Sequence, residues 1–239
     1  MICSRSWLGP YDLPTFGQTG LAARTDYVVL SPTSVLLFIT ANKQNGEEGK
    51  VCCVRSDDGC KTWALQSFVD GDAEPVDEQI MPASLLLPDG SLLVATRCCG
   101  DGHGGRSPTR QWIDIYRSKD EGRSFQHIAR PIDQASRAHG NPPTLSLLPD
   151  GTICMVYGYR EQPYGLRYVL SDLLTGGAQW GEEHVLRDDG GCSDLGYVRA
   201  NGRDDGKVLA AYYYNDDAEG DRYIASTIFT PSGHTGPRL

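Results

Sequence analysis

Short apolar runs rich in β-favouring residues alternate with polar turns along the whole chain. Four of these runs have similar spacing and cover Val35–Thr40, Ser91–Thr96, Thr152–Tyr157 and Val208–Tyr214. The turns before the second and third runs read Pro88-Asp89-Gly90 and Pro149-Asp150-Gly151. An Asp-Gly turn between two strand-like segments predicts a β-hairpin, because glycine tolerates a positive φ and aspartate bonds nearby backbone amides.

Each expected hairpin is followed by a third apolar segment and then by a second recurrent phrase. The third segments are Lys50–Arg55, Gln111–Arg117, Leu166–Leu170 and Arg222–Phe229. The phrase is clearest in Ser56–Trp63 (SDDGCKTW) and Ser118–Phe125 (SKDEGRSF), with weaker copies ending at Trp7 and Trp180. A fourth strand is expected after each phrase. Four antiparallel strands repeated about every 55–62 residues predict the blades of an all-β propeller.

The two clear phrases resemble the Asp boxes of sialidases (neuraminidases) and of bacterial proteins with BNR repeats. The resemblance covers nearly the whole chain, and it implies one sialidase-like β-propeller domain over residues 1–239. Because a sialidase propeller has six blades, about four repeats imply a ring that is incomplete at its N-terminal side. The alternative is a closed four-bladed ring, in which a strand near Ser6–Tyr11 completes the last blade. Open strand edges would favour homo-oligomers.

Net charge and cysteine content limit which partners, cofactors and cellular location the sequence predicts. The net charge of −9 argues against nucleic acid as a partner, and no apolar run reaches the roughly 18 residues that a membrane helix needs. Residues 1–20 lack the pattern of a signal peptide, which favours a cytoplasmic location. The eight cysteines have no C-x-x-C spacing with histidines, so we expect buried thiols in a reducing compartment, no zinc and no other cofactor.

The irregular loops of the predicted blades carry the candidate chemistry. In each blade the Asp-Gly hairpin and the Asp box lie at one end, so the other loops share the opposite end near the axis, where binding residues usually lie. Segments that enter the first strands supply Arg24, Asp26, Asn141, Asp194 and Tyr197, and loops after the second strands supply Arg97, Arg160 and Tyr164. Acids, arginines and tyrosines together are suited to processing a sugar.

The sialidase resemblance suggests roles for these residues. Sialidases hold a substrate carboxylate with arginines, which form paired hydrogen bonds, and they use a tyrosine nucleophile. The implied substrate ligands are Arg24, Arg97, Arg160 and Asn141; the implied acid/base is Asp26 or Asp194; the implied nucleophile is Tyr197 or Tyr164. Structural roles are the alternative, since Arg24 and Asp26 could pair, Arg160 could stack on a tyrosine, and Asp194 could cap a turn.

The predicted function is therefore an exo-glycosidase that removes a terminal sugar from an acidic glycan or oligosaccharide. Two other functions fit the same residues. A carbohydrate-binding propeller would use the arginines without catalysis. A polysaccharide lyase would use a tyrosine or histidine to remove a proton next to a uronate carboxylate.

Overall fold

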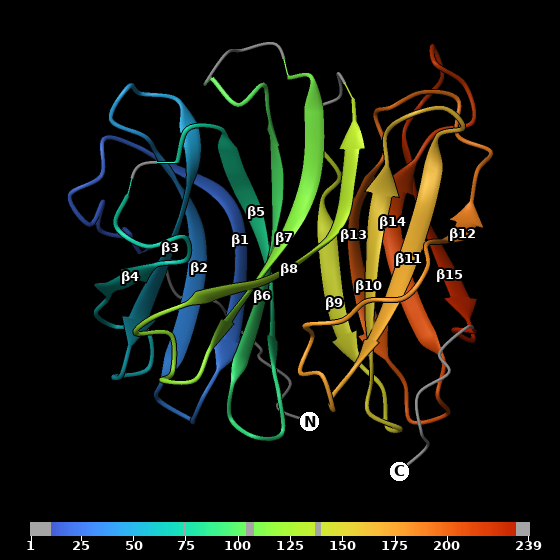
Figure 1. Cartoon of the computed structure of the whole chain (residues 1–239). Helices are drawn as coiled ribbons and strands as arrows, with labels where there is room; N and C mark the ends of the chain where they lie inside the picture. Colours follow the sequence, from blue (N-terminus) through green and yellow to red (C-terminus); the bar gives the residue numbers. More distant parts are fainter. Residues whose placement is uncertain (1–10, 74, 104–107, 137–139, 233–239) are drawn as a thin grey trace.

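The computed structural model describes residues 11–73, 75–103, 108–136 and 140–232, with the side chains of residues 23 and 24 left out. Over these residues the chain forms strands and no helix. The strands pair antiparallel, in chain order, into four sheets that are the blades of a propeller (Figure 1). The prediction of an all-β propeller with four blades is confirmed.

Blades 1 to 3 have four strands each, and blade 4 has three among the described residues. Blade 1 contains β1 (Leu21–Val29), β2 (Val35–Asn42), β3 (Glu48–Ser56) and β4 (Ala64–Phe68). Blade 2 contains β5 (Glu78–Leu86), β6 (Leu92–Gly100), β7 (Arg110–Ser118) and β8 (Gln126–Ala135). Blade 3 contains β9 (Pro143–Leu147), β10 (Thr152–Tyr159), β11 (Gly165–Asp172) and β12 (His184–Arg187). Blade 4 contains β13 (Gly196–Gly202), β14 (Val208–Tyr214) and β15 (Tyr223–Phe229).

The predicted hairpins join the first two strands of each blade. Between β5 and β6, the amide of Gly90 donates to the carbonyl of Leu87 at 2.9 Å, and Asp89 Oδ1 accepts from the amide of Ser91 at 2.9 Å. The β9–β10 turn repeats this arrangement around Asp150 and Gly151. The repeated sequence thus corresponds to a repeated set of hydrogen bonds.

The Asp boxes form the turns between the third and fourth strands. In the first box, Asp58 Oδ1 accepts from the amides of Lys61 and Thr62, both at 3.0 Å, and Oδ2 accepts from the Thr62 hydroxyl at 2.7 Å. In the second box, Asp120 accepts from the amide and hydroxyl of Ser124 at 2.9 and 2.6 Å. Each carboxylate therefore closes its own turn.

Apolar side chains fill the spaces between neighbouring blades. Because successive strand residues face opposite sides, Ile113 and Ile115 of β7 pack toward blade 3, whereas Tyr116 packs toward blade 1. Burying each isoleucine contributes about 1.5–3 kcal/mol. The aromatic of the second box joins the cluster between blades 1 and 2: the Phe125 ring lies edge-on to Phe38 of blade 1, with 6.1 Å between centroids. Trp63, the aromatic of the first box, packs instead against a cluster within blade 1.

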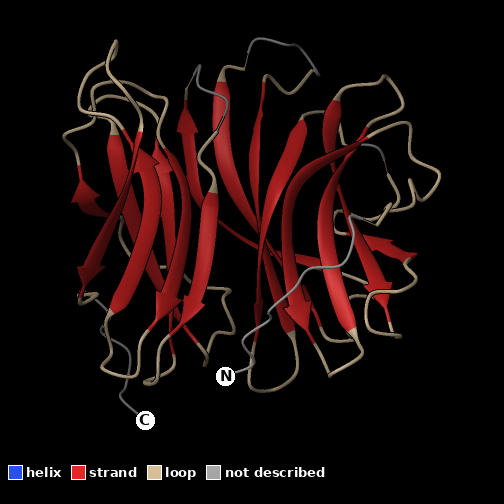
Figure 2. Ribbon diagram, turned by 180° about the vertical axis from the view of Figure 1, so that it is seen from behind, coloured by secondary structure: helices blue, strands red, loops and turns tan. Residues whose placement is uncertain are grey.

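Figures 1 and 2 show that the two ends of the propeller differ. The lower end carries the short hairpins, and the upper end carries the loops that join β2 to β3, β6 to β7, β10 to β11 and β14 to β15. Of these loops, β6–β7 and β14–β15 are longer than the hairpin turns. Five cysteines are buried, namely Cys52, Cys53, Cys98, Cys99 and Cys154, whereas Cys60 is exposed. A search of the described residues finds no helix with the length and hydropathy needed to cross a membrane.

Blades 1 and 4 meet differently from the other neighbouring pairs. Within the described ranges, no apolar cluster spans them, and their inner strands are joined by a hydrogen bond from Arg199 Nη2 to the Thr25 carbonyl at 2.9 Å. The free face of blade 4 exposes Ile224 and Ile228. The expected strand at Ser6–Tyr11 lies almost wholly outside the described residues. Ring truncation and self-association stay predictions.

Candidate functional site

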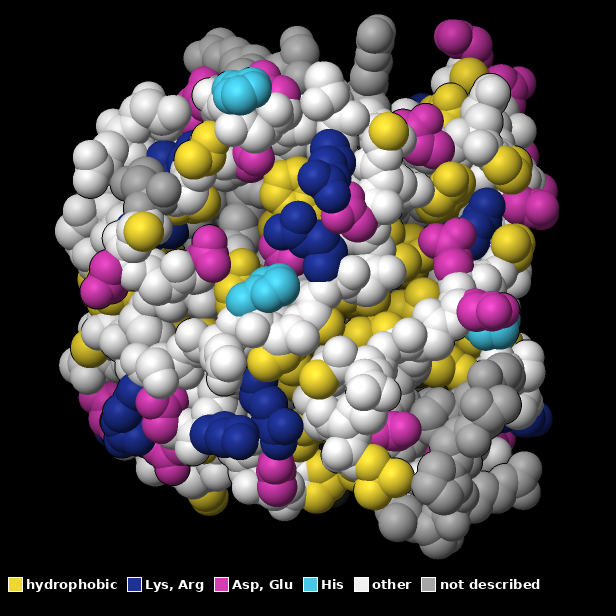
Figure 3. Space-filling view, in the orientation of Figure 1, with side chains coloured by type: hydrophobic (Ala, Val, Ile, Leu, Met, Phe, Trp, Pro, Cys, Tyr) yellow, Lys and Arg dark blue, Asp and Glu magenta, His cyan; other side chains and the backbone are white. Residues whose placement is uncertain are grey.

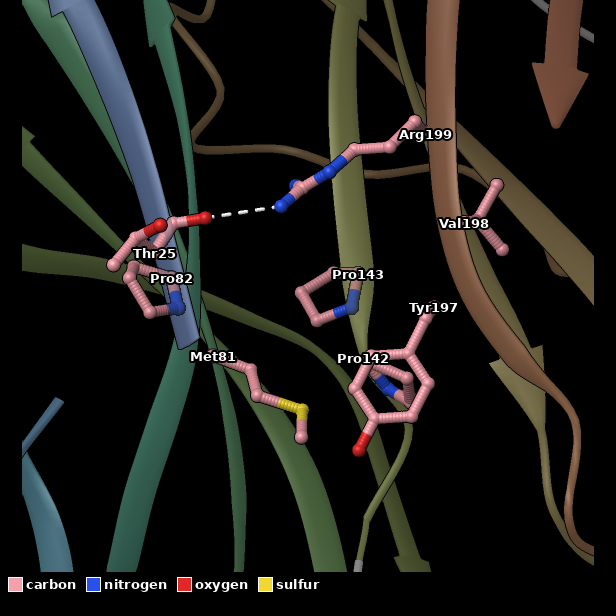
Figure 4. A pocket seen from close by; sticks show the side chains of 8 residues that line it. All are labelled: Thr25, Met81, Pro82, Pro142, Pro143, Tyr197, Val198 and Arg199. Carbon is pink, nitrogen blue, oxygen red and sulfur yellow. Dashed lines mark hydrogen bonds between the residues drawn. The ribbon is translucent and has the colours of Figure 1, made fainter. Parts of the chain in front are cut away.

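A hollow of about 190 Å³ lies on the propeller axis, where the innermost strands of all four blades converge (Figure 4). It is lined by Thr25, Met81, Pro82, Pro142, Pro143, Tyr197, Val198 and Arg199. In Figure 4 the Tyr197 ring and the Met81 side chain extend into the space between the strands, and Arg199 reaches across to Thr25. The site is thus built from segments that enter the first strand of each blade.

The inner strands are irregular at this hollow. Pairing slips between Ala22 and Asp26 in β1, and the corresponding segments of β5 and β13 also bulge. Within these bulges Met81 and Tyr197 have φ values of 51° and 46°, which are unusual for residues other than glycine. Bulges redirect side chains, and backbone strain gathers at functional sites. The distortion of two strands therefore marks the axial hollow as a site.

Arg97 lies beside the hollow as a buried cation. It lies within β6, where it pairs with Ile113 of β7, and not in the loop after that strand as the sequence predicted, because β6 continues to Gly100. It faces blade 3 and is 4% exposed. Its Nη1 donates to the Met81 sulfur at 3.0 Å, and its Nε has no hydrogen-bond partner among the described residues. Burial lowers the pKa of Arg97, and the positive charge of Arg160 lowers it further. A buried guanidinium with a thioether as its acceptor is suited to receive an anion.

Gly140 permits this placement of Arg97. Gly140 has a φ of 78°, and a Cβ atom there would lie 2.9 Å from the Arg97 Cγ and 3.0 Å from the Cys98 carbonyl oxygen. The next residue, Asn141, is 1% exposed and accepts the Arg160 amide on its Oδ1 at 3.1 Å. Its Nδ2 has no partner in the described part of the chain. A second buried donor therefore stands beside the arginines.

Arg160 extends from the end of β10 toward blade 4. Its Nε and Nη2 donate to the Leu195 carbonyl at 3.1 and 3.0 Å, and Nη2 also lies 3.3 Å from the Tyr213 hydroxyl. The guanidinium carbon is 5.3 Å from the centre of the Tyr197 ring. These contacts fix the orientation of Arg160 above a tyrosine pair, since the Tyr197 and Tyr213 rings lie 5.5 Å apart.

The tyrosine pair includes a tyrosine–carboxylate couple. The Tyr213 hydroxyl donates to Asp194 Oδ1 at 2.7 Å, and Arg222 Nε donates to Asp194 Oδ2 at 3.0 Å. These hydrogen bonds, that from Tyr213 first, lower the pKa of Asp194. Burial and the hydrogen bond to Asp194 raise the pKa of Tyr213. At neutral pH the couple is therefore a neutral phenol that donates a hydrogen bond to an ionised carboxylate, and both pKa shifts oppose transfer of the proton within this resting pair.

The predicted site residues fall into two groups. Arg97, Asn141, Arg160, Asp194 and Tyr197 gather at the axial end in contact with one another or through shared partners. Of these five, Tyr197 lines the hollow itself, and the other four lie beside or behind it.

The other three predicted residues lie elsewhere. Asp26 lines an adjoining hollow of about 500 Å³, where its Oδ2 accepts from the Ser84 amide and hydroxyl at 2.5 and 3.0 Å. Tyr164 packs against the apolar cluster between blades 3 and 4 and does not line the axial hollow. Arg24 belongs to the bulged part of β1, and its side chain lies outside the described residues.

Sequence reasoning missed Tyr213, Arg199 and Arg222. Tyr213 is the middle member of Tyr212-Tyr213-Tyr214 in β14, a segment predicted only as a strand. Alternation would have shown that Tyr213 faces away from its two neighbours, which pack into the core between blades 3 and 4. No set of three or more His, Cys, Asp or Glu residues in the described ranges could hold a metal ion.

Comparisons with known proteins support the fold. No family model matches the chain, and no curated protein matches it in sequence. A protein of unknown function from Dyadobacter fermentans has a similar structure, with a TM-score of 0.74 and 25% identity over 94% of this chain and 60% of that one. An α-L-arabinanase of Penicillium chrysogenum, solved with arabinobiose, has a TM-score of 0.65 and 17% identity, and the match covers 90% of this chain and 65% of that one.

A GH43 endo-arabinanase of Bacillus licheniformis is also similar, with a TM-score of 0.62 and 14% identity over 92% of this chain and 75% of that one. Two of these proteins are described as arabinan-acting enzymes and none as a sialidase. These comparisons confirm the predicted propeller fold and give no support to the sialidase family itself. The chain spans about 60% of the Dyadobacter protein that it matches.

Proposed function

We propose that the axial hollow binds the acidic terminal sugar of a glycan and that the protein hydrolyses its glycosidic bond. The observation that carries this proposal is the buried guanidinium of Arg97, whose acceptor among the described residues is a thioether. Arg160 and the unpartnered Nδ2 of Asn141 add donors at the same place. A sugar carboxylate would satisfy these donors, because arginines bind carboxylates through paired, charge-assisted hydrogen bonds.

The tyrosine–carboxylate couple supports a hydrolytic step. In the proposed reaction the Tyr213 oxygen attacks the anomeric carbon while Asp194 accepts the phenol proton, and the bond to the leaving oxygen breaks. Asp26, in the adjoining hollow, is assigned the proton given to the leaving group. Water then attacks the anomeric carbon of the glycosyl–tyrosine intermediate, an aryl glycoside, and gives a proton to Asp26. The bond between that carbon and the Tyr213 oxygen breaks as Asp194 returns the phenol proton to the oxygen. Tyr213 thus replaces Tyr197 and Tyr164 as the preferred nucleophile.

The structural neighbours favour a glycan as the substrate class. The Penicillium enzyme binds arabinobiose in its solved complex. The buried guanidinium of Arg97 favours an acidic sugar over neutral arabinose, because its acceptor among the described residues is a thioether and a sugar carboxylate would be a stronger one. A sialoside or a uronide is therefore preferred to an arabinoside.

A panel of fluorogenic substrates tests the proposal. Sialosides, glucuronides and arabinofuranosides are incubated with the protein, with Tyr213→Phe and Asp194→Asn variants, and with Tyr223→Phe as a matched control. Tyr223 is a suitable control because its hydroxyl bonds Asp216 away from the axial hollow. We expect release from an acidic sugar, a loss of roughly 10³-fold in kcat for Tyr213→Phe, and no loss for the control. Equal activity in Tyr213→Phe and Tyr223→Phe would remove the couple from the mechanism.

One observation favours a second function, binding without catalysis. Both oxygens of Asp194 are already engaged, by Tyr213 and Arg222, and its lowered pKa resists taking up a proton. A binding propeller would show affinity for an acidic oligosaccharide by calorimetry, lost in Arg97→Met, with no release from any substrate in the panel. The lyase alternative needs a tyrosine–histidine pair, and no described residue that lines the hollow is a histidine.

A further inference from the structure

A second polar crevice lies on the other face of blade 2. Along β6 the side chains alternate, so that Arg97 faces blade 3 whereas Thr96 and Cys98 face blade 1. The connection from β4 to β5 covers this second face and leaves a crevice of about 310 Å³. Figure 3 shows a histidine and a group of basic and acidic side chains around apolar surface near the middle of the molecule. The crevice is separated from the axial hollow by the sheet of blade 2.

The floor of the crevice is fixed by Asp114. This residue is buried, and its carboxylate accepts from Trp112 Nε1 at 2.8 Å, from Arg130 Nε at 2.7 Å and from His127 Nε2 at 2.9 Å. The Arg130 guanidinium also lies 4.9 Å from the centre of the Trp112 ring. Asp114 is therefore fully engaged, and its partners hold the Trp112 ring as part of a firm wall.

Gln79 supplies the observation that points to a ligand. It is 4% exposed, and its Nε2 donates to the Tyr116 hydroxyl at 2.8 Å, while that hydroxyl donates to Asp70 Oδ1 at 2.9 Å. Tyr116 has one proton, and the Asp70 carboxylate is its stronger acceptor, so the amide of Gln79 must donate to Tyr116. Gln79 lines the crevice, and its buried amide oxygen has no donor among the described residues.

The charges around the crevice indicate which kind of ligand it can bind. Carboxylates of Asp70, Asp77, Glu78 and Asp114 line it, against the cation of Arg130 and the imidazole of His127. The excess of negative charge disfavours an anion. A buried amide oxygen and exposed carboxylate oxygens call for a ligand that donates several hydrogen bonds. The partly exposed indole of Trp112 offers apolar surface beside these acceptors.

We propose that this crevice is a second carbohydrate site, which binds a sugar residue that carries hydroxyl or amino donors and no acidic group. Binding at this crevice does not depend on catalysis in the axial hollow. The crevice is expected to disfavour acidic sugars, whereas the axial hollow is proposed to bind them. Gln79 Oε1 accepts from a hydroxyl or ammonium group of the sugar, Asp70 accepts from a second, and Trp112 contacts the ring.

Titration calorimetry on the full chain tests the proposal with three defined probes: chitosan tetrasaccharide, cellotetraose and tetragalacturonate. We expect the first two to bind with dissociation constants of about 0.1–1 mM and the acidic probe to bind this crevice at least about tenfold more weakly. Gln79→Met should weaken the first two about tenfold. Gln126→Met, at the exposed start of β8, is the matched control and should change nothing.

Two further variants separate the possible outcomes. Asp70→Asn keeps an acceptor for Tyr116 but removes a charge, so it should weaken the amino sugar more than the neutral one. Arg97→Met should leave both probes unaffected, because it alters only the axial hollow. The proposal is overturned if Gln79→Met binds like Gln126→Met, if the acidic probe binds as well as the others, if affinity follows Arg97, or if neither expected probe binds at 10 mM, about tenfold above the weakest expected constant.

Discussion

The two ends of the propeller differ in how completely their polar groups are hydrogen-bonded. At the Asp-box end, the residues that form the turns find hydrogen-bond partners within their own turn: Asp120 accepts from Ser124, and the Ser118 hydroxyl accepts from the Gly122 amide at 2.8 Å. At the axial end, Arg97 and Asn141 are almost fully buried, yet each keeps a nitrogen without a partner among the described residues. Hydrogen bonds within the turns stabilise the Asp-box end. The unpartnered nitrogens at the axial end can instead donate hydrogen bonds to a ligand.

This difference has an energetic consequence. A buried hydrogen-bonding group without a partner costs about 1–3 kcal/mol, and more when it is charged. The axial end therefore lowers stability, and the box end raises it. Substitutions at the axial end should therefore change ligand affinity, and substitutions at the Asp-box end should change the free energy of unfolding alone.

The largest effect is expected at Arg97. Replacing it by methionine removes the buried cation, so affinity for an acidic oligosaccharide should fall about 10²-fold or more, since charge-assisted bonds contribute about 1.5–3 kcal/mol each. The free energy of unfolding should rise by about 1–3 kcal/mol, because an unpaired buried charge is removed. Calorimetry and denaturant unfolding measure the two quantities.

Arg97→Lys is the matched control, because it keeps the charge and loses the planar fork. It should weaken binding without the gain in stability. If Arg97→Met were less stable than the native chain, the guanidinium would be contributing to folding, and the contrast between the two ends would fail.

The second effect is expected at Asp120. Its replacement by alanine leaves the Ser124 amide and the hydroxyls of Ser118 and Ser124 without their acceptor. We expect the free energy of unfolding to fall by about 2–3 kcal/mol with no change in ligand affinity. Asp204→Ala, in the exposed β13–β14 turn, is the control and should be neutral. A loss of affinity in Asp120→Ala would show that the two ends are coupled.

The same contrast explains what the sequence could predict. The hydrogen bonds that close the boxes and hairpins are local, since Asp58 accepts from the amides of Lys61 and Thr62 and Asp89 accepts from the amide of Ser91, so a repeated phrase predicts a repeated turn. The predicted strand Val208–Tyr214 agrees with β14 in both bounds. Periodic apolar runs and Asp-Gly turns were therefore enough to predict the four blades.

The axial site could be predicted only in part, because its contacts are between blades. Arg97 and Arg160 were selected because the sequence placed both at strand ends, which the structure confirms for Arg160 but not for Arg97, since β6 continues to Gly100. The Tyr213–Asp194 couple joins residues 19 apart that a strand and a loop bring together. The positive φ of Met81 and Tyr197 has no glycine to signal it. Tyr164 was selected from its loop alone, and the chain turns it toward the core between blades 3 and 4.

Acid should weaken the box end in a defined pH window. Hydrogen bonds from the amide and hydroxyl of Thr62 lower the pKa of Asp58 to about 2. A carboxyl whose folded pKa lies below its unfolded value stabilises the fold above about pH 4, and this contribution disappears as the pH falls through about 2. Asp58→Asn should therefore flatten the decline in thermal midpoint between pH 4 and pH 2. An unchanged slope, equal to that of Asp204→Asn, would contradict the assignment.

The smallest effect separates the two boxes from each other. Cys60 has a φ of 68° at the position where the second box has Gly122, whose φ is 81°. A side chain in the left-handed region costs about 1 kcal/mol, so Cys60→Gly should raise the free energy of unfolding by about 0.5–1 kcal/mol. Gly122→Ala should lower it, because a Cβ there would also lie 3.0 Å from the Cys53 sulfur. We expect urea unfolding in reducing buffer to show opposite signs for the two substitutions. If Cys60→Gly were destabilising, the Cys60 side chain would stabilise the fold by more than its left-handed backbone conformation costs.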